Sequence, residues 1–218
     1  MPRFSQDTEN TLAEVAVVFG FEHALAYYEQ VQDLRKEIQP SPEDSLKRDA
    51  IEDQLLARLS RWLQSPPEAG FFITVGYLRH LRNSISHVHS TSSPKFSQFA
   101  SDNAARLKLF WEGKPAELGQ FDFQNTPQQP LTFENAISLS NLNRICVKEI
   151  DRLFAESLDQ DVVMKTVIQR FWNNRPELRG NHARLSRKAR KQILTDFGAD
   201  LTELTIDTAV NDFLGSTP

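Results

Sequence analysis

The chain has 218 residues, of which 39% are hydrophobic and 25% are charged, as in a globular protein with one large domain or a domain and an appendage. Residues 1–19 lack a basic start followed by an apolar run, and Glu22 ends the apolar patch at 15–21. Neither a signal peptide nor a membrane span is therefore predicted. The single cysteine, Cys146, excludes an intramolecular disulfide and a cysteine zinc cluster, which favours a reducing, cytoplasmic location.

The first half of the chain is predicted to form three helices. Apolar residues recur at three- and four-residue steps over residues 7–38. Ser41-Pro42 predicts the start of a second helix, a capping serine followed by proline, and its apolar stripe is Ile51, Leu55, Leu59 and Trp62. The sequence at 65–68 repeats this start signal and adds a capping-box glutamate. The third helix should end near His87, before a loop at 86–95, and its inward residues are Phe71, Val75, Leu78, Leu81 and Ile85.

The second half is predicted to contain a hairpin and four more helices. Residues 106–123 resemble two short strands around Glu112-Gly113-Lys114. Thr132 is expected to cap a long helix that runs to about residue 157, and three shorter helices should follow Asp159. The expected fold is thus all-α. An antiparallel helical bundle would span residues 1–158, with a β-hairpin insertion at about 105–124, and a C-terminal helical appendage would span 159–218.

Residues 77–90 carry an unusual number of polar groups suited to phosphate chemistry. On a helical wheel Arg79, Asn83 and His87 fall four residues apart, and Arg82 lies beside Arg79. A guanidinium binds phosphate through two parallel hydrogen bonds, and an imidazole transfers protons near neutral pH. Together they can cleave RNA without a metal if a second proton-transfer group is supplied by His89, by His80 or by another subunit.

The segment Arg82-Asn83-Ser84-Ile85-Ser86-His87 resembles the Arg-x4–6-His motif of the HEPN superfamily, in which asparagine often follows the arginine. The resemblance covers about residues 7–158. It implies a helical bundle that dimerises with facing motifs and cleaves RNA without metal or cofactor, in toxin–antitoxin, phage-defence or RNA-processing systems. It also implies catalytic roles for Arg82 and His87, with Asn83 as their polar partner, and an antitoxin or defence protein as a possible partner. Arg79, His80 and His89 are candidate substrate-binding residues from the helical wheel, not from the motif.

Other interpretations of this segment stay open. Arg82 and Asn83 can make surface contacts only, with His87 at a helix end, in a protein that binds RNA or a partner without cleavage or in a purely structural one. A metal site at His80, His87 and His89 is disfavoured because Glu68 is the only acidic residue between Asp53 and Asp102. The nearby serines lack the G-x-S-x-G turn of a hydrolase.

The chain carries a net charge of −4, but residues 175–191 hold seven basic residues and one acidic residue, a local charge of +6. As a helix, this segment would place Arg184, Lys188 and Lys191 on one side, with Arg187 adjacent, and would turn Leu185, Ala189 and Ile193 inward. The four basic residues are either a solvated face or a binding surface for RNA phosphates. Trp111, Phe171 and Trp172 are candidates for base stacking or for the core.

Overall fold

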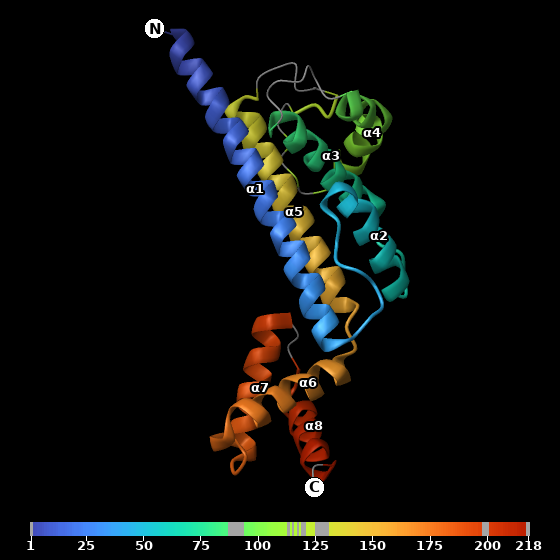
Figure 1. Ribbon diagram of the computed structural model, residues 1–218, viewed down its shortest axis with the longest axis vertical. Coiled ribbons are helices and arrows are strands. Elements are labelled where there is room, and N and C mark those ends of the chain that lie inside the picture. Colours follow the sequence, from blue (N-terminus) through green and yellow to red (C-terminus); the bar gives the residue numbers. More distant parts are fainter. Residues whose placement is uncertain are drawn as a thin grey trace. The chain divides into compact units, whose positions relative to one another are not determined.

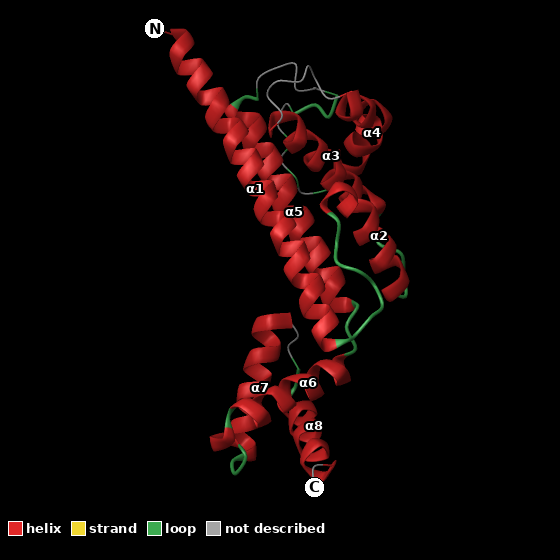
Figure 2. Ribbon diagram, viewed as in Figure 1, coloured by secondary structure: helices red, strands yellow, loops and turns green. Residues whose placement is uncertain are grey.

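The computed structural model describes residues 2–86, 94–112, 114, 116, 118, 121–124, 131–197 and 201–216. In these ranges every regular element is a helix and no strand is present, so the all-α class is confirmed (Figure 2). The chain divides into two compact units: Met1–Gln32 with Asp44–Leu153, and Asp33–Glu43 with Phe154–Pro218. The division along the chain thus falls at 153/154, and the end of the first helix is grouped with the second unit.

The first unit is built around two long helices, most of α1 (Pro2–Ile38) and α5 (Phe133–Glu156), which lie side by side (Figure 1). The Asn143 side chain donates to the Gly20 carbonyl over 2.9 Å, and the Tyr27 hydroxyl donates to Asp151. Later residues of α1 therefore meet later residues of α5, and the two helices run parallel. This pair departs from the antiparallel order expected, because the three helices between them return the chain to the same end.

Three further helices complete the first unit: α2 (Ile51–Trp62), preceded by the 3₁₀ turn η1 (Arg48–Ala50), α3 (Ala69–Ser86) and α4 (Pro94–Glu112). The apolar residues that recur at helical spacing in the sequence form the buried side of these helices. The core includes Phe21, Leu25, Tyr28, Ile51, Leu55, Leu59, Phe72, Val75, Leu78, Phe96, Leu107, Trp111, Leu139, Leu142 and Ile150. Of the inward residues expected on α2 and α3, Trp62 and Ile85 are only half-buried.

The expected hairpin is wrong in its first strand, because residues up to Glu112 belong to α4. Phe96, Ala100, Ala104, Leu107 and Trp111 are buried at helical spacing. Pro94 opens the helix, where a missing backbone N–H costs nothing. In the expected second strand, the residues that the structure describes at 116, 118 and 121–124 form coil and turn. The start of α2 is also later than expected: Ser41 and Pro42 lie in an extended connection, and the helix begins at Ile51.

The second unit contains α6 (Gln160–Asn174), the 3₁₀ turn η2 (Pro176–Leu178), α7 (His182–Phe197) and α8 (Glu203–Ser216). The three helices expected after Asp159 are confirmed. The Asp159 carboxylate caps α6 by accepting from the backbone N–H groups of Asp161 and Val162. The apolar core of this unit comprises Ile38, Val163, Met164, Val167, Ile168, Leu178, Leu185, Ala189, Ile193, Ile206 and Val210.

Candidate functional site

Helix α3 holds the candidate site at its C-terminal end because its first three turns are anchored in the core. Two glycines allow close packing there. A methyl group on Gly70 would lie 2.3 Å from the Phe110 ring, and one on Gly76 would lie 2.9 Å from Phe99 and 3.1 Å from Glu52. The last turns of the helix then leave the core, and their polar side chains are half-buried at Arg79, His80, Arg82 and Asn83.

Arg82 and Asn83 are brought together at a partly exposed position. The Arg82 Nη1 group donates to the Asn83 side-chain oxygen over 2.6 Å, and its Nη2 group pairs with the Glu22 carboxylate on α1. The Arg82 side chain is 28% exposed. Its Nε atom is buried and has no hydrogen-bond partner within the described residues. The side chain is therefore held from two directions and is only partly shielded from solvent.

Glu22 links Arg82 to a second arginine. Its other carboxylate oxygen lies 3.1 Å from Arg48 Nη1, and Arg48 Nε lies 2.7 Å from Glu29. This contact with Arg48 lowers the pKa of the Glu29 carboxyl. Two cationic and two anionic groups thus alternate along one edge of α1, and we call Glu22, Glu29, Arg48, Arg82 and Asn83 the α1–α3 network. A phosphate that reached Arg82 would compete with the Glu22 carboxylate for the guanidinium.

Arg79 and His80 form a separate and more buried cluster with Glu52 of α2. Arg79 makes a bidentate ion pair with Glu52, 2.8 Å from Nε and 2.5 Å from Nη2, and its side chain is only 12% exposed. Arg79 Nη2 also lies 3.0 Å from His80 Nε2. Since a guanidinium has no acceptor, Nε2 must accept this hydrogen bond, and the imidazole is neutral there. Arg79 is therefore committed to a structural ion pair.

The environment of His80 favours its neutral form. The imidazole lies against the Phe99 ring, with 4.7 Å between centroids. Burial lowers the pKa of His80, the positive charges of Arg79 and Lys95 add to this, and only Glu52 opposes them. The lone pair of Nε2 is already used by Arg79. These contacts leave His80 poorly placed to supply the second proton-transfer group.

The remaining predicted site residues do not belong to the described part of the first unit. His87 and His89 lie outside the described residues. Arg184, Arg187, Lys188 and Lys191 belong to α7 in the second unit. On α7 the expected inward residues Leu185, Ala189 and Ile193 are buried, which confirms that prediction, and Arg184, Arg187 and Lys191 are exposed. Lys188 is half-buried.

Of the aromatic candidates for base stacking, Trp111 is buried, whereas Phe171 and Trp172 are half-buried. Trp111 is buried, and its indole N–H donates to the Thr74 hydroxyl over 2.9 Å. Trp172 packs edge-to-face on Phe213, with Arg179 5.5 Å from the indole ring. Phe171 is half-buried beside the same core. Trp111 is thus a core residue and its proposed stacking role is wrong, because no face of its ring is open.

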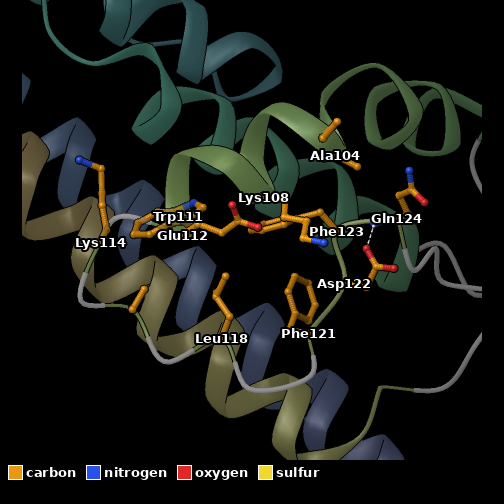
Figure 3. Close-up of a pocket in the computed structure, with 12 residues that line it drawn as sticks. Ala104, Lys108, Trp111, Glu112, Lys114, Leu118, Phe121, Asp122, Phe123 and Gln124 are labelled. Carbon is orange, nitrogen blue, oxygen red and sulfur yellow. Dashed lines mark hydrogen bonds between the residues drawn. The ribbon is translucent and has the colours of Figure 1, made fainter.

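A pocket of about 660 Å³ opens beside α4 (Figure 3). Its polar lining carries both signs of charge, from Lys108, Glu112 and Asp122, and its apolar lining includes Phe121 and Phe123. None of the predicted arginines or histidines lines it. Mixed charge over an apolar floor does not select phosphate, so we do not assign the candidate chemistry to this pocket.

Two residues of the site, Glu22 and Glu52, were missed by sequence reasoning. They lie 60 and 27 positions from their arginine partners, and no local pattern links such distant residues. The two acidic residues Glu22 and Glu29 do stand two helical turns apart on one side of α1, which was a usable signal.

Within the described residues, no three histidine, cysteine, aspartate or glutamate side chains are grouped as a metal site would require. None of the described helices combines the length and the apolar character needed to cross a bilayer. No protein-family model matches the chain, and neither the curated proteins nor the solved structures contain a significant match to it.

Proposed function

We propose that this chain is a metal-independent endoribonuclease of the HEPN type, acting in the cytoplasm as a homodimer in a toxin, phage-defence or RNA-processing role. The observation that carries the proposal is the geometry of Arg82. This guanidinium is partly exposed and fixed by Asn83 and Glu22, at the end of the helix that leads to His87. A fixed cation beside a titratable ring is what cleavage of a phosphodiester by its own 2′-hydroxyl requires.

In the proposed reaction the ribose 2′-oxygen attacks the adjacent phosphorus and the bond from phosphorus to the 5′-oxygen breaks. One proton leaves the 2′-hydroxyl and one proton reaches the departing 5′-oxygen, so the products are a 2′,3′-cyclic phosphate and a 5′-hydroxyl. His87 transfers one of these protons, and Arg82 stabilises the charge on the pentacoordinate phosphorus. Asn83 orients the guanidinium. Single-stranded or loop RNA suits this step because in-line attack needs a flexible backbone.

Arg82 has hydrogen-bond capacity left for a phosphate. A guanidinium carries five N–H bonds, and Asn83 and Glu22 each use one of the four on its Nη atoms. The other two Nη hydrogens can bind phosphate oxygens, while Glu22 holds the side chain in place. The carboxylate also reduces the net charge at the site, so the affinity for RNA should be modest.

A second candidate function, a non-catalytic module that binds RNA or a partner protein, is favoured by one observation. Both arginines of the α3 end already have carboxylate partners, Glu22 for Arg82 and Glu52 for Arg79. Such pairs weaken the attraction of the site for a highly charged transition state. A surface that only binds needs no free cation at the reacting atom.

The test is to incubate the purified chain with single-stranded RNA in excess EDTA, beside Arg82→Ala and His87→Ala variants. We expect cleavage in EDTA, products with a 2′,3′-cyclic phosphate, and at least a hundredfold loss of rate in both variants. Ser86→Ala, an exposed change in the same segment, and Arg106→Ala, which removes an exposed arginine from α4, are the matched controls and should keep full activity. Arg79→Ala is unsuitable as a probe, since it would leave Glu52 as a buried charge without its partner.

Cleavage that requires added metal, or Arg82→Ala and His87→Ala variants as active as the controls, would refute the ribonuclease mechanism. RNA binding without any product would instead support the binding module.

A further inference from the structure

One side of the α1–α5 pair carries large apolar side chains that the described residues of the first unit leave exposed. Leu12, Val15 and Phe19 of α1 are 63%, 43% and 63% exposed, and Phe133 and Ile137 of α5 are 67% and 48% exposed. We call these five residues the α1–α5 face. Apolar side chains gain free energy when they leave water, so a set of five grouped together favours a partner.

The five residues lie on the same side of the two helices. On α1, Gly20 and Tyr27 contact α5 and Phe21, Leu25 and Tyr28 face the core. On a helical wheel the set Leu12, Val15 and Phe19 is centred about 100° from the α5 contact, on the side opposite the core. The same construction on α5, with contacts at Asn143 and Asp151, places Phe133 and Ile137 away from the core as well. Because the helices run parallel, both sets point outward from one common surface.

We propose that the α1–α5 face binds a second copy of this chain, with the two α1 helices antiparallel and the two-fold axis passing between Val15 and Ala16. The proposal names a surface for the homodimer of the proposed function and rests on that function only for its biological role. No residue of α3 lies on this surface, so the contact does not by itself bring the two Arg82 side chains together. In this arrangement Leu12 packs against Phe19 of the partner subunit, and each Val15 lies beside the axis.

Charged residues at the edge of the face support this register. On α5, exposed Glu134 lies between Phe133 and Ile137, and exposed Arg144 lies two turns beyond Ile137. In an antiparallel pair, the two-fold axis lies at the midpoint of any two positions that it brings together. The midpoint of positions 12 and 19 on α1 is 15.5, and the midpoint of positions 134 and 144 on α5 is 139. These two midpoints are 123.5 positions apart in the sequence. The two hydrogen bonds between the helices join residues 123 and 124 positions apart. One two-fold axis therefore pairs Leu12 with Phe19 of the partner subunit and also Glu134 with Arg144 of the partner subunit.

A parallel arrangement of two copies does not have this complementarity. It would bring Glu134 to the same level as Glu9 and Glu134 of the partner subunit, and like charges at an interface are unfavourable. The antiparallel arrangement pairs opposite charges twice. Interfaces between identical copies must be self-complementary, and this face meets that requirement at Leu12 with Phe19 and at Glu134 with Arg144.

The size of the face sets the strength expected of the dimer. The positions from Phe133 to Arg144 span about 17 Å along the helices, and two helices side by side are about 20 Å wide. This is smaller than the roughly 800 Å² that each partner contributes to a standard interface. We therefore expect a dimer that dissociates in the micromolar range, which requires measurement over a wide range of concentration.

The test is sedimentation velocity of the full chain without RNA, from submicromolar to several hundred micromolar protein. We expect wild type to dimerise with increasing concentration and Phe19→Asp to raise the dissociation constant at least tenfold. Arg144→Glu alone and Glu134→Arg alone should each weaken the dimer, and the double variant should restore it to within about threefold of wild type. Leu109→Asp is the matched control, because Leu109 of α4 is 73% exposed and lies outside the face, and it should have no effect.

Wild type that stays monomeric over the whole range, or a double variant no better than the single variants, would overturn the proposed interface. An equal loss in Leu109→Asp would also overturn it. The ribonuclease proposal fails separately if the chain dimerises, its variants change the dissociation constant as expected, and RNA stays intact. A chain that stays monomeric and still cleaves RNA would support the ribonuclease proposal and refute the proposed interface.

Discussion

Arg79 and Arg82 stand one helical turn apart on α3, yet their surroundings give them different roles. The Arg79–Glu52 pair is nearly buried, with side chains 12% and 7% exposed, and breaking such a pair leaves an uncompensated charge. Arg82 and Glu22 are each close to 30% exposed, so solvent screens their attraction and the pair can exchange partners. Arg79 therefore stabilises the fold, whereas Arg82 is the arginine that a phosphate can reach.

Removal of the Glu22 charge should strengthen RNA binding. Glu22→Gln keeps an oxygen that accepts from Arg82 but removes the negative charge that competes with phosphate. We expect the dissociation constant for a single-stranded RNA to fall about fivefold at low salt, measured by fluorescence anisotropy with Arg82 intact. Glu29→Gln is the control, since it removes the same charge two turns along α1 and pairs with Arg48 only. An equal gain in both variants, or no gain at Glu22, would show that Glu22 does not compete with RNA.

His80 should make the stability of the protein depend on pH in a defined direction. Its pKa is lowered in the folded state by burial and by Arg79, with Lys95 adding and Glu52 opposing. As the pH falls below about 6.5, the unfolded chain binds the proton first, so wild type loses stability that His80→Gln does not lose. Urea unfolding at pH 7.5 and pH 5.5 should show this loss, with His23→Gln as the control for removal of an imidazole. A difference between wild type and His80→Gln that is constant with pH would contradict the prediction.

At the scale of helices, the apolar period and the capping residues predicted most of the fold. The Thr132 hydroxyl accepts from the Asn135 backbone N–H, and Asp159 caps α6, so both start signals act as expected. Ser41-Pro42 does not start a helix because a start signal needs a continuous apolar stripe after it, and Leu46 is the only large apolar residue before Ile51. The apolar run at residues 107–111 predicts a strand because a short run fits either period. The alternating period does not include Phe96, Ala100 and Ala104 upstream, which continue the same buried side of a helix. The carboxylate partners of Arg79 and Arg82 come from other helices, so they depended on packing that no single helix encodes.

The contact between α3 and α4 predicts an unusual effect of alanine at a helical glycine. Alanine is normally favoured over glycine in a helix by up to about 1 kcal/mol. At Gly70 the added methyl group would lie 2.3 Å from the base of the Phe110 ring, so the two helices must move apart. Gly70→Ala should lower the free energy of unfolding by about 1–2 kcal/mol. Gly180→Ala, where nothing lies within 4 Å, should change it by less than about 0.5 kcal/mol in the same urea unfolding experiment. Equal effects of the two substitutions would exclude tight packing as the cause.

At the scale of the whole molecule, charge is distributed unevenly along the chain. Residues 175–191 carry +6 in a chain of net charge −4, so the remainder carries −10. The basic residues of this segment lie in the second unit, and Arg184, Arg187 and Lys191 are exposed along α7 while its apolar side is buried. An exposed basic helix on an acidic chain is the arrangement that binds phosphates locally without a generally basic surface.

If α7 contacts RNA, three substitutions there should reduce both the affinity and its dependence on salt. Each phosphate contact releases bound counterions, and on single strands it adds about 0.7 to the slope of log affinity against log salt. The variant with Arg184→Gln, Arg187→Gln and Lys191→Gln should therefore lower that slope by about 2. Glutamine retains the helix propensity of α7, and unchanged circular dichroism would show that the helix is intact. Arg106→Gln, Lys108→Gln and Lys165→Gln together remove the same charge from exposed positions on α4 and α6. If this control lowers the slope equally, net charge rather than α7 governs binding, and if neither variant changes it, RNA binds elsewhere.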